Sequence, residues 1–379
     1  MTRPGARLAP RLRGLLAAGK RGGLKAALLL LHSTGLARAF APATRGRGAI
    51  FMLHSVSPER PSRFDPNGIL RVTPGFLEEA ILATRAAGHD IVSLDEAVRR
   101  LAEQQPGAPF ACFTLDDGYR DNLLYAYPIF KRHQAPFTIY VATDFCDGSG
   151  DLWWIVLENA IRAASRLDVS IGGERLTLDT GTPRQKSEAF AAIYWPLRKL
   201  PEREMRAIVR GIARDAGYDP APLCGDLIMT WDEVRELAKD PLVTIGAHTR
   251  SHLALAKLTE EEAREEIAGS VARIEQELGV RCRHFAFPYG DASAAGPREF
   301  ELARALGLAT AVTTRKGVVG EAVRGALCAL PRVSLNGDYQ KARFVSVYLT
   351  GLPFRLAALA GSLLRSAVRR QAASAPAKP

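Results

Sequence analysis

From residue 49 onward, short apolar runs alternate with stretches in which apolar residues recur every three or four positions. The short runs lack a strict apolar–polar alternation, which predicts strands that are buried on both faces. The stretches between them predict amphipathic helices, and this order is typical of a parallel α/β sheet. The predicted strands are residues 49–56, 91–94, 110–115, 137–143, 242–247, 284–287, 309–313 and 330–335. The predicted helices are residues 76–87, 95–103 (with Asp95 as N-cap), 122–133, 260–278 and 297–306.

About seven strand–helix units predict a (β/α) barrel, closed or incomplete, over residues 49–345. The alternation stops at about residues 151–230, where two short strand-like runs flank Gly172-Gly173 and helical segments rich in Arg and Glu follow. We expect this insertion to form a cap over the barrel mouth. Residues 1–48 and 346–379 are predicted to form basic, amphipathic end segments.

The net charge of +11 is distributed unevenly along the chain. Residues 1–48 hold ten Lys or Arg and no acid, residues 341–379 hold seven and no acid, and the body between them therefore carries −6. This distribution does not support a folded basic groove for nucleic acid. Basic ends on an acidic body favour contact with an anionic membrane surface.

The apolar residues of the N-terminal segment predict a helix that lies on such a surface. Leu24, Leu28 and Leu31 recur at helical spacing beside lysines and arginines. The alternative is an export signal, because Ala39-Phe40-Ala41 resembles a cleavage site, but the apolar run 26–31 is short for one. We therefore favour a cytoplasmic protein or one at the inner membrane face over an exported one.

Two further features bear on location. No stretch approaches the roughly 20 apolar residues that span a bilayer. At the C-terminal end, Leu352, Leu356 and Leu359 predict a helix that either faces a membrane or packs back onto the barrel. Five widely spaced cysteines without a CxxC pair favour buried free thiols in a reducing compartment.

Ligands and catalytic groups of parallel barrels gather at the carboxyl ends of the strands. At one such end, Asp116-Asp117-Gly118 directly follows an apolar strand. Two adjacent carboxylates that leave a strand point different ways, so they can take different roles at one centre. The alternative is a solvated turn, in which Asp-Gly is common.

A second strand end carries His248-Thr249-Arg250-Ser251-His252. If this turn is helical, the two histidines share a face and can bind one metal ion. The alternative is that they are a chance pair on a solvated helix. Together with the double Asp they make three protein ligands, which leave positions open for water and substrate as in catalytic zinc sites. A third strand end carries Pro288-Tyr289-Gly290, in which Pro and Gly fix the backbone. We expect this backbone to present the Tyr289 N–H to a developing oxyanion. The alternative is a turn without function.

The order Asp-Asp-Gly, His-x-x-x-His and Pro-Tyr-Gly resembles the polysaccharide deacetylases of the NodB-homology group (carbohydrate esterase family four). Leu53-His54-Ser55-Val56 is also similar to the exopolysaccharide branch of that family. The resemblance covers about residues 49–150 and 231–335 and implies a distorted (β/α) barrel. The roles it implies are a catalytic base at Asp116, ligands of a divalent cation at Asp117, His248 and His252, and part of an oxyanion hole at the Tyr289 backbone.

The implied chemistry is metal-assisted amide hydrolysis. A bound cation makes its water more acidic and polarises the acetyl oxygen, while Asp116 takes the proton of the water. We expect Zn²⁺, with Co²⁺, Ni²⁺ or Mn²⁺ as alternatives.

The chain departs from the family pattern at two places. Many members carry an Arg that orients the base two residues before the Pro of the third motif, where this chain has Ala286. Many also end in Leu-x-His, whose His is the general acid, where this chain has Leu330-Pro331-Arg332. Arg stays protonated and cannot shuttle a proton, so the acid has to be sought elsewhere.

These departures lead to two hypotheses about the site. Both strand ends open onto the same mouth, so we expect Arg332 to pair with Asp116, orienting it and keeping it ionised. The alternative is that Arg332 is a rim residue bonded to a loop carbonyl. His54, at the carboxyl end of its strand, is the candidate acid or substrate ligand, with a structural histidine as the alternative.

The predicted function is hydrolytic N-deacetylation of a GlcNAc-type residue in an oligo- or polysaccharide, as in chitooligosaccharide deacetylases, on linear amide rather than peptide bonds. Trp153 and Trp154 are candidates for stacking on a sugar, and we expect one to be buried and one to line the cleft. Pro288 is a further candidate for substrate binding. One alternative is deacetylation or deformylation of a lipid-linked sugar at the membrane. The other is a non-catalytic glycan-binding relative.

Overall fold

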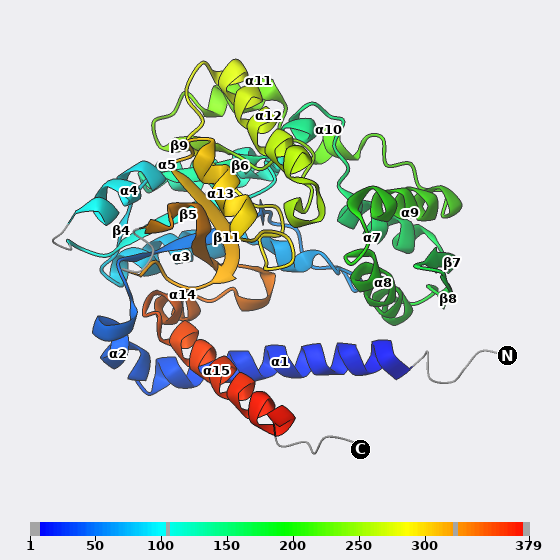
Figure 1. Cartoon of the computed structure of the whole chain (residues 1–379), viewed down its shortest axis with the longest axis horizontal. Helices are drawn as coiled ribbons and strands as arrows, with labels where there is room; N and C mark the ends of the chain where they lie inside the picture. The colour runs from blue at the N-terminus through cyan, green and yellow to red at the C-terminus, as the bar shows by residue number, and fades with distance from the viewer. Residues whose placement is uncertain (1–7, 104–106, 321–324, 374–379) are drawn as a thin grey trace.

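The computed structural model describes residues 8–103, 107–320 and 325–373, without the side chains of residues 8–18, 20, 21 and 363–373. Within this part, seven parallel strands close into a barrel (Figure 1). In order around the barrel these strands are β1 (Gly48–Leu53), β5 (Phe110–Leu115), β6 (Phe137–Val141), β9 (Val243–Ala247), β10 (His284–Ala286), β11 (Thr310–Lys316) and β12 (Leu330–Ser334), which pairs with β1. The predicted (β/α) barrel is therefore confirmed, and it is closed.

An eighth parallel strand, β4 (Asp90–Ile91), lies outside this closure. β5 pairs with β1 along its whole length, while its other edge is divided between two partners. Phe110 and Ala111 pair with β4, and the residues from Phe113 onward pair with β6. A register shift between β11 and β12 distorts the barrel further. Residues of β1, β5 and β6 are buried throughout, as expected for strands covered on both faces.

Helices follow the strands. They are α3 (Pro74–Ala86), α4 (Leu94–Ala102), a π-helical turn (Asn122–Ala126) leading into α5 (Tyr127–Arg132), α6 (Thr143–Cys146), α11 (Trp231–Leu237), α12 (Glu260–Leu278), α13 (Pro297–Ala305) and α14 (Ala342–Leu349). Five of them (α3, α4, α5 with the turn before it, α12 and α13) lie where the hydrophobic pattern predicted. α12 has the predicted bounds because Thr259 and Glu262 form a capping box at its start and Gly279 ends it with φ 66°. The prediction of Asp95 as the N-cap of α4 is wrong. Ser93 has the extended backbone that lets its side chain accept the Glu96 N–H.

The insertion between β6 and β9 contains a hairpin and four helices. It consists of α7 (Trp153–Ala163), the antiparallel strands β7 (Arg166–Ile171) and β8 (Glu174–Asp179), α8 (Pro183–Leu197), α9 (Glu202–Asp215) and α10 (Leu223–Leu227). The hairpin turns at Gly172-Gly173, both with positive φ, which glycine adopts without steric cost. Figure 1 shows α7, α8, α9 and the hairpin gathered at one side of the barrel.

Segments from the two ends of the chain meet on one face of the barrel. α1 (Leu8–Ser33) contacts α2 (Leu36–Thr44), α14 and the insertion helix α8, while α15 (Leu352–Ala373) contacts α2 and α14. Figure 1 shows α1 and α15 crossing below the barrel. α14 in turn packs on α3, so these terminal helices form an extra layer outside the barrel helices. All five cysteines are buried and free.

Candidate active site

Asp116 and Asp117 stand where β5 ends, and both are buried. The Asp116 N–H donates to the Leu53 carbonyl of β1 at 3.0 Å, so this residue continues the strand pairing. Asp117 has φ 74°, a left-handed conformation that Asp tolerates better than most residues. The change in backbone direction sends the two carboxylates to different partners. The solvated turn, the alternative reading of Asp-Asp-Gly, is excluded by their burial.

The segment from His248 to His252 is a loop after β9 and not the helical turn that the spacing suggested. Thr249 and His252 have φ values of 65° and 56°, which a right-handed helix does not permit. The His252 N–H instead donates to the Thr249 hydroxyl at 2.9 Å and closes a turn. The i, i+4 argument is therefore wrong here, although the loop still brings the two rings to a centroid distance of 4.9 Å.

Backbone strain is concentrated in this region. Of the five described non-glycine residues with positive φ, four are Asp117, Thr249, His252 and Tyr289. Each such conformation costs free energy and persists where the surrounding structure holds it. The strained residues belong to the three strand-end motifs, so they mark one site.

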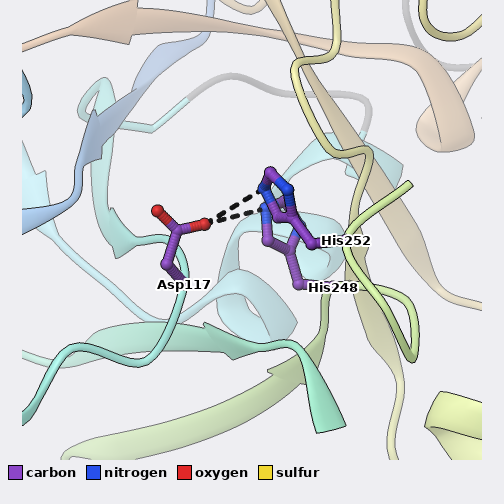
Figure 2. Close-up of side chains that lie close together, drawn as sticks. All are labelled: Asp117, His248 and His252. Carbon is purple, nitrogen blue, oxygen red and sulfur yellow. Dashed lines mark ion pairs between the residues drawn. The ribbon is translucent and has the colours of Figure 1, made fainter. Parts of the chain in front are cut away.

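Asp117, His248 and His252 converge on one point, as Figure 2 shows. Oδ1 of Asp117 lies 3.5 Å from Nε2 of His248 and 3.2 Å from Nε2 of His252. One ligand atom from each residue lies within 4.8 Å of the others, and all three residues are buried. This is the ligand number and type of a catalytic zinc site.

The hydrogen-bonding pattern of these residues fits a cation. His248 Nδ1 lies 2.7 Å from the Ala286 carbonyl oxygen and donates to it, so a neutral ring presents its Nε2 lone pair toward Asp117. Within the described part of the chain, Asp117 Oδ1 has no hydrogen-bond donor. Burial lowers the pKa of His252, which favours its neutral form. An imidazole lone pair and a buried carboxylate oxygen that face each other repel unless a cation lies between them.

Arg332 pairs with Asp116 through two parallel hydrogen bonds. Nη1 donates to Oδ1 and Nη2 donates to Oδ2, each at 2.7 Å. The guanidinium also donates to the Thr313 carbonyl and the Thr114 hydroxyl, and Arg332 is only 1% exposed. The pairing expected from the sequence is therefore present, and Arg332 is not a rim residue.

This contact sets the charge of Asp116. Burial by itself raises the pKa of the Asp116 carboxyl, but the Arg332 charge and its hydrogen bonds outweigh burial, so this pKa lies below its ordinary value. Ala286, where the family resemblance implies an orienting Arg, is fully buried, and its carbonyl oxygen accepts from His248. This position therefore orients a candidate metal ligand through its backbone.

His54 lies beside this pair. It lies between β1 and the short strand β2 (Ser55–Val56), which pairs with β3 (Arg71–Val72). Its Nε2 is 3.9 Å from Asp116 Oδ2, and its side chain is 20% exposed. The ring is therefore partly open to solvent beside the carboxylate, as a proton carrier or substrate ligand has to be.

The third motif contributes the Tyr289 backbone and ring. Tyr289 has φ 61°, and no hydrogen bond from its N–H is found among the described residues. Its hydroxyl accepts from the Trp153 indole at 2.7 Å, and its ring lies 4.9 Å from that of His252. Pro288 is buried and accepts the Gly290 N–H, so it shapes the turn. A direct contact of Pro288 with substrate stays a prediction.

Arg206 of α9 was not identified from the sequence. This buried arginine donates to the backbone carbonyls of Ser251 and His252 and to that of Asp151. The insertion therefore holds the loop that carries one candidate metal ligand. No sequence signal distinguished Arg206 from the other arginines of the insertion, because its role depends on contacts 45 and 46 residues away.

The two tryptophans of α7 are both buried, and they face different surroundings. Trp153 donates to Tyr289, whereas Trp154 lies 5.0 Å from the His252 ring and donates to the Tyr119 hydroxyl. Trp154 and Tyr119 line a cavity of about 520 Å³. This wall is rich in charged and hydroxyl-bearing side chains, among them Ser55, Ser57, Asp65, Arg71, Asp121, Tyr125 and Arg162.

Comparisons with known proteins agree with this geometry. Residues 175–311 match the family model described as polysaccharide deacetylase. This range contains His248, His252 and Tyr289, while the Asp116–Asp117 pair precedes it. No curated relative matches the chain.

Two solved structures share the fold. The deacetylase PplD from Streptococcus pyogenes, solved in complex with acetate, is 17% identical, with 76% of this chain and 92% of that chain covered and a TM-score of 0.51. IcaB from Ammonifex degensii is 18% identical, with 80% and 98% covered and a TM-score of 0.50. At this identity the likeness shows the fold. Over residues 175–311 the chain is therefore similar to the polysaccharide deacetylases, which are hydrolases that act on amide bonds, and the whole barrel shares its fold with solved deacetylases.

Proposed function

We propose that this protein hydrolyses the N-acetyl group of a GlcNAc-type residue in an oligo- or polysaccharide, in a reaction that depends on a divalent cation. The observation that carries the proposal is the buried Asp117, His248 and His252 cluster beside an Asp116 carboxylate paired with Arg332. Zn²⁺ is the expected ion because imidazole and carboxylate ligands in this number suit it, with Co²⁺, Ni²⁺ and Mn²⁺ as alternatives.

The cavity next to the cluster supports a glycan substrate. Its volume of about 520 Å³ falls within the roughly 300–1,000 Å³ of small-ligand sites. Its polar side chains offer partners for sugar hydroxyls, and the half-exposed Tyr125 ring is available for stacking. Because Trp154 separates the cavity from His252, the cavity would hold sugar residues next to the one that reacts.

Asp117, His248 and His252 would hold the cation. When bound, it would make a water molecule more acidic and polarise the acetyl oxygen. Asp116 accepts the proton of the water, and the two-pronged contact with Arg332 keeps it ionised and fixes its orientation. The Tyr289 N–H donates to the negative charge that develops on the acetyl oxygen. The water oxygen bonds to the acetyl carbon and the C–N bond breaks, which yields acetate and a free amine.

The leaving amine needs a proton, and Arg332 cannot supply one. His54 Nε2 lies 3.9 Å from Asp116 Oδ2, a distance that one bridging water or a small ring movement closes. We therefore assign His54 the role of proton carrier or that of a substrate ligand. A His54→Gln variant should lose turnover and keep its metal. Full activity in this variant would leave the proton transfer to Asp116 alone.

Two other readings remain to be separated from this one. A lipid-linked sugar substrate, deacetylated or deformylated at a membrane, is favoured by the basic terminal helices, of which α1 contacts the insertion helix α8. A non-catalytic glycan-binding relative is disfavoured by the ionised, oriented Asp116.

The deciding experiment measures free amine release from a panel of N-acetylated oligosaccharides, polysaccharides and lipid-linked sugars, with and without a chelator. We expect release from at least one acetylated glycan, loss of release with chelator and recovery with added Zn²⁺. The matched control is Asp116→Asn, which should bind the same glycans without releasing amine. Glycan binding without any amine release from the unchanged protein would instead favour the non-catalytic reading.

A further inference from the structure

The outward surface of the terminal helices is apolar, which is unusual for helices that cover a soluble barrel. Of the thirteen large hydrophobic residues exposed in the described part of the chain, seven belong to these helices. We call this set the terminal apolar surface: Leu24, Leu29, Leu30, Leu36, Phe40, Leu356 and Leu359. The barrel and its insertion, which are much longer, share the other six.

Each helix of this layer buries some apolar residues and leaves others exposed. In α1, Leu28 is fully buried, while Ala26, Ala27 and Leu30 face outward, with Leu30 61% exposed. In α2, Leu36 and Phe40 are four residues apart, share a face and are both exposed. In α15, Leu352 is buried at the start of the helix, whereas Leu356 and Leu359, one and two turns further along the same face, are exposed. The C-terminal segment therefore both packs onto the protein and presents an apolar face.

Basic side chains accompany this surface. Among the described exposed residues, Arg38 lies in α2, Arg45 follows the end of α2 and Arg355 lies in α15, and residues 1–48 and 341–379 contain no acid. We propose that the terminal apolar surface docks on an anionic lipid bilayer, with Leu and Phe side chains between the headgroups and the arginines on lipid phosphates. A second copy of the chain fits less well, because a symmetric contact would bring together two sets of helices that both lack acids.

The depth of this contact follows from the helices themselves. Among the described residues, no single helix is long and apolar enough to span a membrane. One bent pair, Ala342–Leu349 with Leu352–Ser362, passes by length and composition only, with a bend of 64°. Phe344, Val345 and Leu349 of its first helix are buried in the protein core, so only the second helix has apolar residues to offer to lipid. The proposed contact is therefore with the bilayer surface. It uses a different face of the N-terminal helix from the one that the spacing of Leu24, Leu28 and Leu31 predicted, because Leu28 is fully buried against the protein.

The terminal layer also lies near the glycan cavity. Lys25 of α1 is 5.7 Å from the ring of Tyr339, in a 3-10 turn (Gly337–Tyr339) that follows β12. This turn contacts a second one (Gly68–Leu70) whose Leu70 lines the cavity. Docking would thus place the cavity rim close to the headgroup layer. This step rests on the proposed function and favours a glycan attached to, or lying on, the membrane.

The test is flotation of the full chain with vesicles of phosphatidylcholine alone and of phosphatidylcholine with 30% phosphatidylglycerol. We expect binding to the anionic vesicles to exceed binding to the neutral ones by about tenfold or more at low salt, and to weaken as salt screens the arginines. Equal binding to both vesicle types, or to neither, would overturn the proposal.

Matched variants distinguish lipid binding by this surface from nonspecific hydrophobic binding. Leu30→Ser with Leu359→Ser should lose most of the binding, whereas Leu82→Ser with Val280→Ser should not, although Leu82 and Val280 are 50% and 62% exposed. For charge, Arg38→Gln with Arg355→Gln should weaken binding about tenfold, while Arg203→Gln with Arg214→Gln on α9 should leave it nearly unchanged. If a terminal-helix variant and its control lost vesicle binding equally, in either the apolar or the arginine comparison, the assignment of this surface would be contradicted.

Two readouts keep this proposal apart from the proposed function. Amine release from a soluble acetylated oligosaccharide should be the same in the Leu30→Ser, Leu359→Ser variant and the unchanged protein. Sedimentation should show the same oligomeric state in both. A change from dimer to monomer in this variant, without vesicle binding by the unchanged protein, would assign the surface to a second copy instead.

Discussion

The barrel mouth at the carboxyl ends of the strands and the terminal apolar surface both depart from the usual distribution of side chains. The mouth buries charged side chains, whereas the terminal helices expose apolar ones. At the mouth, Asp116, Asp117 and Arg332 are almost completely buried. On the terminal helices, Leu30 and Leu359 are mostly exposed. Folding alone favours neither arrangement, because buried charges lose hydration and exposed leucines order water.

The two regions differ in how the unfavourable arrangement is offset. Asp116 is compensated inside the protein by a two-pronged arginine, whereas Asp117 Oδ1 has no donor among the described residues. Leu30 and Leu359 of the terminal helices likewise stay exposed within the described chain. These uncompensated groups are the basis of the two proposals, a cation at the mouth and lipid at the terminal helices.

The largest expected effect separates the two neighbouring aspartates. Asp116→Asn should lower turnover by about 10²–10⁴-fold and keep the metal, because it removes a proton acceptor and no ligand. Asp117→Ala, His248→Ala and His252→Ala should each lose both metal and activity. Metal content by elemental analysis, alongside amine release, checks the distinction. Stoichiometric metal in a His248→Ala/His252→Ala double variant would contradict the ligand assignment.

Variants of Arg332 test whether its guanidinium compensates the buried charge of Asp116. Arg332→Ala should lower turnover about 100-fold with metal content unchanged, since the orientation of the base is lost. Arg332 holds the pKa of Asp116 down, so removing it raises this pKa. Because the base works only when ionised, the acidic limb of the pH–rate profile should move to higher pH. Arg332→Lys should restore activity only in part, because an ammonium cannot donate in two parallel bonds. An unchanged acidic limb in Arg332→Ala would refute the electrostatic role.

Arg206 tests the contribution of the insertion to the site. Arg206→Ala removes the donor that holds the Ser251 and His252 carbonyls, and we expect metal affinity to fall about 10–100-fold. Arg203→Ala on the same helix is the matched control, because that side chain is 92% exposed and far less constrained. Competition with a chromogenic chelator measures both. Equal affinities in the two variants would mean that the loop keeps its shape without the insertion.

The smallest expected effect concerns the terminal helices. Leu30→Ser should change the free energy of unfolding by no more than about 0.5 kcal/mol, because its side chain faces outward. Leu28→Ala, two residues away and fully buried, should cost about 2–5 kcal/mol. Denaturant unfolding in the absence of lipid compares the two. A similar cost for both would show that Leu30 packs against protein and is not available to lipid.

Much of the fold could be predicted because strand and helix periodicities are local. All eight strands of the main sheet and α12 lie where the apolar pattern places them, within a few residues. The N-cap of α4 was missed because two capping residues, Ser93 and Asp95, stand close together and the backbone conformation selects between them. The domain boundaries at residues 48 and 345, and the location in the cell, stay predictions.

By itself the sequence determined which residue types stand at the carboxyl ends of the strands, since each motif directly follows an apolar run. It also predicted the Arg332–Asp116 pair, because one departure from the family pattern removes an arginine, at Ala286, and the other supplies one, at Arg332. Only the tertiary structure decided how His248 and His252 meet, through positive φ values rather than helical spacing. It alone revealed Arg206, and it alone showed which faces of the terminal helices stay exposed. The reason is physical: periodicity depends on neighbours in the chain, whereas hydrogen bonds and burial depend on residues that only the closed barrel brings together.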